Sequence, residues 1–136
     1  MRLVIDSNVI IAAFAARGLC HALFEYCLES HDVILCESII KEVKKNLRKK
    51  IKAPASLVAG IEAYLRESTS IEKPIPVDPG VFEDKSDLPV LGVAAASDSS
   101  YLITGDKALL GLRKYKNTDI VDPRSFWEVV KKKANK

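Results

Sequence analysis

The chain lacks the cysteine and histidine spacing that small proteins use for disulfide or zinc cross-links. Its three cysteines, Cys20, Cys27 and Cys36, are odd in number and show no paired spacing, which argues against a disulfide framework and favours a reducing compartment. The two histidines form no ligand pair, because one merely adjoins a cysteine and the other stands alone. At 136 residues the chain can bury a core without cross-links, so we expect one domain over residues 1–136.

A long hydrophobic run is also missing. The longest uninterrupted apolar stretch, residues 9–16, is far shorter than the roughly 20 residues of a transmembrane helix. Asp6 interrupts the N-terminal stretch that would otherwise resemble a signal peptide. The sequence therefore predicts a cytoplasmic protein that does not associate with a membrane.

The net charge of +3 is small, but positive charge is concentrated in residues 41–52. This segment holds seven Lys or Arg against one Glu, which is +6, so the rest of the chain sums to −3. Its periodicity predicts an amphipathic helix to about Lys52, with Glu42 bordering the apolar stripe. The predicted buried positions are Ile40, Val43, Leu47 and Ile51. The lysines on the other side of Glu42, predicted to contact RNA phosphates, are Lys41, Lys45, Lys49 and Lys52. A solvated helix face explains the charge equally well.

Strand-like and helix-like segments alternate along the rest of the chain. Strands are expected at residues 3–5, 33–36, 101–104 and 120–121, with helices between them. Four prolines and a glycine in residues 71–89 favour a short edge strand and a long surface loop. This order predicts an α/β fold, a three-layer α/β/α sandwich around a mainly parallel central sheet.

Four acidic residues fall where these strands end or helices begin: Asp6, Glu42, Asp87 and Asp106. Each has a local explanation as a helix cap, a first-turn anion or a turn residue. In a parallel sheet, however, these junctions share one edge, so the carboxylates would converge and repel one another unless protons or a cation neutralise them. Hard oxygen ligands of this kind select Mg²⁺ or Mn²⁺. Three further aspartates are expected to have only local roles: Asp84, Asp98 and Asp122.

Four motifs, "VIDSNVII", "IIKEV", "DLPVLGVAAA" and "YLITGDKALL", occur in the order and spacing found in PIN-domain nucleases. The sequence resembles this family, including the VapC-type toxins of prokaryotic toxin–antitoxin pairs, over nearly its whole length. The resemblance implies that the four acids form the catalytic metal site, with Asn8 and Thr104 as hydrogen-bonding neighbours. The chain departs from many relatives at Leu88, where they carry Asp or Asn, and at residues 99–100, where they carry Ala-Asp.

The resemblance implies a metal-dependent ribonuclease that acts as a toxin and is held inactive by an antitoxin protein. Family members commonly form dimers, although the sequence offers no interface signal. One or two Mg²⁺ or Mn²⁺ ions, about 3.5 to 4 Å apart when paired, support phosphodiester hydrolysis. We expect Asp6 and Asp106 nearest the first ion, with the other two acids binding directly or through water.

Two alternatives remain open from the sequence. A Mg²⁺-dependent phosphohydrolase that forms an aspartyl-phosphate usually has a second carboxylate two residues after its nucleophile, and this chain has Asn8 there. A non-catalytic RNA- or protein-binding PIN-like module would keep the fold and the basic helix without cleaving RNA.

Overall fold

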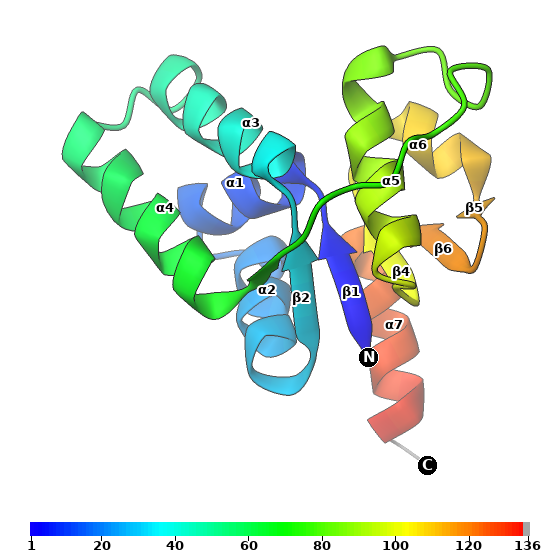
Figure 1. The fold of residues 1–136 in the computed structure, drawn as a ribbon. Helices are drawn as coiled ribbons and strands as arrows, with labels where there is room; N and C mark the ends of the chain where they lie inside the picture. Colours follow the sequence, from blue (N-terminus) through cyan, green and yellow to red (C-terminus); the bar gives the residue numbers. More distant parts are fainter. Residues whose placement is uncertain (135–136) are drawn as a thin grey trace.

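A mainly parallel six-stranded sheet forms the centre of the protein (Figure 1). The computed structural model describes residues 1–134. The strand order is β3-β2-β1-β4-β6-β5; β5 pairs antiparallel with β6, and the other neighbouring strands are parallel. The strands are β1 (Arg2–Ile5), β2 (Asp32–Leu35), β3 (Ser70–Ile71), β4 (Tyr101–Ile103), β5 (Lys114–Tyr115) and β6 (Thr118–Val121).

Helices flank the sheet, as the alternating pattern predicts. In Figure 1, α5 lies in front of the sheet while α2 and α7 lie behind it, and α3 and α4 form a hairpin at one side. The predicted α/β fold with a mainly parallel sheet is thereby confirmed. The helices are α1 (Ser7–Ala15), α2 (Leu19–Ser30), α3 (Glu37–Lys49), α4 (Ala55–Ser68), α5 (Leu88–Ala96), α6 (Lys107–Leu112) and α7 (Pro123–Ala134), with a short 3₁₀ turn at Lys85–Asp87.

The core is built around the central strands. Leu3, Val4 and Ile5 of β1 are each at most 1% exposed, as expected for a parallel strand buried on both faces. Burying one such side chain contributes about 1.5 to 3 kcal/mol. Cys27 and Cys36 are buried free thiols and pack as small hydrophobic residues.

The end of α3 corrects the predicted basic helix. The helix stops at Lys49; Ile51 is 45% exposed instead of buried, and Lys52 lies outside the helix with φ 58°. Pro54 keeps the preceding residue, Ala53, out of helical geometry, so the helix could not have continued beyond Lys52; it ends earlier, before the turn that contains Lys52. A residue with positive φ just beyond the last turn is a common way to end a helix.

Helix caps and sheet edges add smaller details. Asp6 is the N-cap of α1, and Cys36 precedes the first turn of α3. The two-residue strand β5 is too short to leave a period-two pattern, and the sequence did not predict it.

No single helix within residues 1–134 is long and apolar enough to cross a membrane. Helices α1 and α2 reach such a length only when taken together, and the chain bends by 111° between them.

Candidate active site

An open pocket of about 470 Å³ lies where the central parallel strands end. Ligand sites in open α/β sheets occupy this edge, because the loops that leave the strands diverge there. The four acids predicted from the sequence come from four separate segments, and all of them line this pocket: Asp6, Glu42, Asp87 and Asp106.

Asp6 is held rigidly at the base of the pocket. It follows β1 directly and is only 4% exposed. Its Oδ1 accepts a hydrogen bond from the Ser7 amide at 2.8 Å; its Oδ2 accepts bonds from Thr104 Oγ1 at 2.8 Å and Asn8 Nδ2 at 3.1 Å. Burial raises the pKa of Asp6, and these donors partly oppose that rise. The donors therefore compensate part of the cost of burying a carboxylate.

Asp106 is tied to Asp6 through shared neighbours. Strands β1 and β4 are adjacent and in register, which brings the residues after both strands together. Thr104 Oγ1 accepts a bond from the Asp106 amide at 3.0 Å, and Asn8 Oδ1 accepts one from the Gly105 amide at 2.9 Å. Asp106 Oδ1 also caps α6. Thr104 and Asn8 thus link Asp6 to the Gly105-Asp106 segment through hydrogen bonds.

Asp87 shows most directly that the acids converge. It ends the 3₁₀ turn before α5, is half-buried, and makes no capping hydrogen bond, so the N-cap explanation fails for this residue. Burial, followed by the charges of neighbouring carboxylates, raises the pKa of Asp87 to about 7. Those neighbours are Asp6, Asp84, Asp106 and Glu42.

Glu42 reaches the pocket from α3. Its side chain is exposed and accepts a hydrogen bond from Asn46 Nδ2 at 3.4 Å, one turn further along the same helix. Both side chains line the pocket, so the face of α3 that borders the buried stripe forms one wall.

The pocket contains residues that the sequence reasoning did not assign to it. Asp84 was expected to act locally, and it does accept bonds from the Ser86 amide and Oγ, which lower the pKa of Asp84. It also lines the pocket beside Asp87. The sequence shows Asp84 three residues before Asp87, but this spacing is common in ordinary turns and does not by itself indicate a shared site.

The predicted RNA-contacting lysines lie outside the pocket. Lys41, Lys45 and Lys49 are exposed on α3, whereas Lys52 is not on the helix at all. Lys50, which was not singled out, lines the pocket instead. The expected basic row on α3 is therefore one residue shorter than predicted, and the lysine that lines the pocket is a different one.

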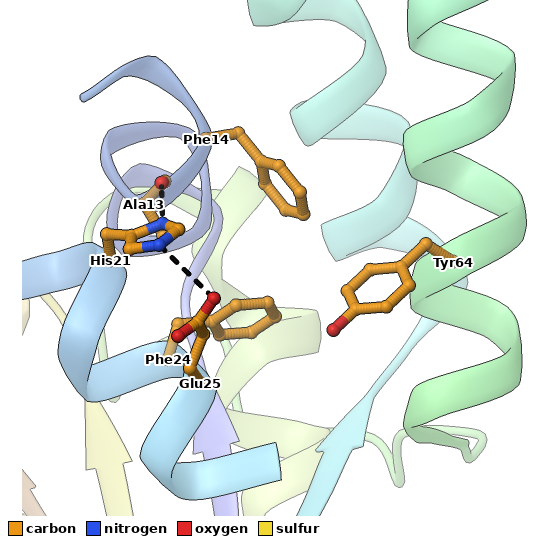
Figure 2. A pocket seen from close by; sticks show the side chains of 6 residues that line it. All are labelled: Ala13, Phe14, His21, Phe24, Glu25 and Tyr64. Carbon is orange, nitrogen blue, oxygen red and sulfur yellow. Dashed lines mark hydrogen bonds and ion pairs between the residues drawn. The ribbon is translucent and has the colours of Figure 1, made fainter. Parts of the chain in front are cut away.

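A second pocket, of about 240 Å³, lies between α1, α2 and α4 and is drawn in Figure 2. Phe14 lies 5.9 Å from Phe24 and 6.2 Å from Tyr64, measured between ring centroids. His21 donates from Nδ1 to a backbone carbonyl of α1 and faces Glu25 at 3.2 Å from Nε2. None of the four acids lines this aromatic pocket, so we assign the chemistry to the acidic one.

The donors of the acidic pocket suit a hard divalent cation. Five carboxylates line it, and no cysteine or histidine takes part. Within residues 1–134, no three Asp, Glu, His or Cys side chains form a compact metal-binding group. Mg²⁺ commonly binds through one or two carboxylates and keeps several waters, so carboxylates spaced around a pocket still fit it.

Fold and pocket together define an α/β protein with an acidic site at the ends of its parallel strands. A family model described as the PIN domain matches residues 2–108, and the chain therefore belongs to the PIN domain family, a family of nucleases. Among curated protein sequences, none matches the chain significantly.

One solved structure with a similar fold is described as the crystal structure of PAE2754 from Pyrobaculum aerophilum. It superposes with a TM-score of 0.64 and 18% sequence identity, over 93% of this chain and 92% of that chain. At this identity the likeness concerns the fold.

Proposed function

We propose that this protein is a metal-dependent endoribonuclease that hydrolyses phosphodiester bonds of RNA. The observation that carries the proposal is the convergence of four carboxylates, from four separate segments, on one pocket. Membership of a nuclease family supports it independently. Carboxylates that converge on one pocket repel one another and do not stabilise the fold, whereas a bound divalent cation would neutralise their charge.

Each acid has a defined part in this proposal. Bound Mg²⁺ or Mn²⁺ would supply an activated water and stabilise the charge that develops on the phosphate and the leaving oxygen. Asp6, oriented by its three donors, is a pre-positioned ligand. Asp106 uses Oδ1 to cap α6, and within residues 1–134 its Oδ2 accepts no hydrogen bond, so Oδ2 is the atom available to a cation. Glu42 from α3 and Asp87 from the turn before α5 complete the proposed site.

RNA is the proposed substrate because of charge next to the pocket. Lys45 and Lys49 are exposed on the same helix that carries Glu42, and Lys50 lines the pocket itself. Lysines attract backbone phosphates without reading their sequence, and this attraction weakens as salt increases. Control by an antitoxin protein, assembly as a dimer and a cytoplasmic location belong to the same proposal, on the strength of the family resemblance alone.

The decisive experiment incubates the purified protein with single-stranded RNA, with and without Mn²⁺. Cleavage should require the cation and should disappear in Asp106→Asn. Asp32→Asn is a matched control, because Asp32 is an exposed aspartate at the start of β2, opposite the pocket edge of the sheet. Absence of cleavage by the wild type, or equal cleavage by Asp106→Asn, would refute the proposal.

The same experiment separates the other functions. Binding of RNA without cleavage at any cation concentration would indicate a non-catalytic module. A phosphorylated Asp6 trapped from a phosphate ester would indicate a phosphohydrolase; the burial of Asp6 and its three hydrogen bonds argue against that nucleophile. The toxin role is tested by expression in growing cells, which should arrest growth for the wild type and leave it normal for Asp106→Asn.

A further inference from the structure

The acidic pocket has an apolar side that the proposed hydrolysis does not use. It consists of Ile11, Ala12 and Ala15 of α1 together with Ile51 just after α3, and we refer to these four residues as the apolar wall. Ala12 and Ala15 are exposed, and Ile51 is one of five exposed large hydrophobic side chains in residues 1–134. The wall is therefore open to a ligand that enters the same pocket as the carboxylates.

The apolar wall begins one helical turn from the acids. Asn8, which holds Asp6 in place, precedes Ile11 by three residues and Ala15 by seven, so these side chains share one face of α1. One turn of helix advances by about 5.4 Å. A nucleotide base is joined to its phosphate through a single sugar. A phosphate at the carboxylates would therefore bring a neighbouring base to the apolar wall.

The size and lining of the pocket are compatible with a nucleotide base. Its volume of about 470 Å³ lies within the range of roughly 300 to 1,000 Å³ typical of small-ligand sites. No aromatic ring lines it, so contact with a base would come from aliphatic side chains along its flat face. Lys50 stands next to Ile51 in the same pocket and offers a positive charge to the next phosphate.

We propose that the apolar wall binds the base of a nucleotide adjacent to the scissile phosphate, while Lys50 contacts the following phosphate. This inference rests on the proposed nuclease activity and deepens it. In this arrangement the carboxylates face the scissile phosphate, the apolar wall faces the adjacent base, and Lys50 faces the next phosphate of the RNA strand.

The test uses an RNA oligonucleotide that the wild type cleaves at a mapped bond with Mn²⁺, and two versions with an abasic nucleotide on either side of that bond. Ile51→Ala should raise KM for the intact oligonucleotide by roughly three- to tenfold, as expected for the loss of part of an apolar contact. Its kcat and its Mn²⁺-induced rise in melting temperature should match the wild type. For one of the abasic versions, the same substitution should leave KM nearly unchanged.

Two variants control for indirect effects. Leu57→Ala truncates a side chain on α4 that is 52% exposed and lies outside the pocket, so it should change KM for none of the oligonucleotides. Lys50→Gln should raise KM equally for the intact and abasic versions, because it removes a phosphate contact and not a base contact.

The outcomes distinguish this inference from the nuclease proposal. If the wild type cleaves no RNA, the nuclease proposal fails and the base site fails with it. If the wild type cleaves but Ile51→Ala leaves KM unchanged, or raises it equally on all three oligonucleotides, the base site is refuted and the nuclease proposal stands. Unchanged kinetics combined with weaker binding of a protein partner would assign the wall to that partner instead.

Discussion

Replacing Asp87 by asparagine should stabilise the metal-free protein above neutral pH. Burial and the surrounding carboxylates raise the pKa of Asp87 from its ordinary 3.8 to about 7 in the folded state. Between about pH 4 and 7 the folded state thus binds more protons than the unfolded state, so stability falls as pH rises through that window. Above about pH 7, Asp87 is ionised in both states, so the full free-energy cost of its half-buried charge lowers the stability of the folded state. Asparagine carries no charge and removes this cost.

The size of the effect follows from the shift in pKa and the exposure of Asp87. Conversion at 1.36 kcal/mol per pKa unit would give about 4 kcal/mol. Because Asp87 is only half-buried, solvent screening reduces the effect, and we expect about 1 to 2 kcal/mol at pH 8 and almost none at pH 4. For a chain of this length, such a gain corresponds to a rise in melting temperature of roughly 3 to 8 °C.

Thermal melting in the presence of a chelator, at pH 4 and pH 8, measures this difference. Asp32→Asn, which removes an exposed carboxylate outside the pocket, should show no comparable gain at pH 8. Adding Mn²⁺ at about 100 times its dissociation constant should stabilise the wild type by about 2.7 kcal/mol, and Asp87→Asn should respond less. A destabilised Asp87→Asn at pH 8, or the same difference from the wild type at both pH values, would refute the electrostatic reasoning.

Three further predictions concern packing, orientation and charge. Gly92→Ala should destabilise the protein by about 1 to 3 kcal/mol in a denaturant titration, because its new Cβ would collide with the backbone carbonyl of Ile75. Gly60→Ala is the control: this glycine has open space around it, so the substitution should stabilise the protein by about 0.5 to 1 kcal/mol. Thr104→Val should cost about 1 to 3 kcal/mol and lower kcat, because a buried carboxylate loses a donor, whereas Thr104→Ser should keep most of both. Lys45→Gln and Lys49→Gln should each reduce the slope of log binding constant against log salt by about 0.7; an unchanged slope would remove these lysines from the RNA interface.

The sequence was sufficient to predict the central strands and the two acids that follow them. Leu3, Val4 and Ile5 form a continuous apolar run, and such runs in a chain of alternating strands and helices indicate a parallel sheet. A parallel sheet has one carboxyl-terminal edge, so the sequence placed Asp6 and Asp106 on the same edge. The sequence did not predict the strand order, and it is the adjacency of β1 and β4 that brings these two acids together.

Helix ends and weak local signals could not be predicted in the same way. The periodicity that placed Ile51 in the buried stripe continues beyond Lys49, where the helix ends, and the apolar pattern gave no sign of the positive φ at Lys52. Ile51 therefore lies outside the helix and forms an exposed part of the pocket lining. Asp84 makes the local turn that was expected of it, and its additional place in the pocket depends on a distant contact that no local pattern shows.

That distant contact explains how an irregular segment can supply part of an ordered site. The proline-rich stretch before Asp84 and Asp87 crosses α5, where the Ile75 amide donates to the Gly92 carbonyl at 3.2 Å. The crossing is possible because Gly92 has no Cβ. The stretch is thereby held against the helix that Asp87 precedes, and both aspartates reach the pocket from there. The acids on this side of the site therefore depend on a helical glycine whose importance no local pattern reveals.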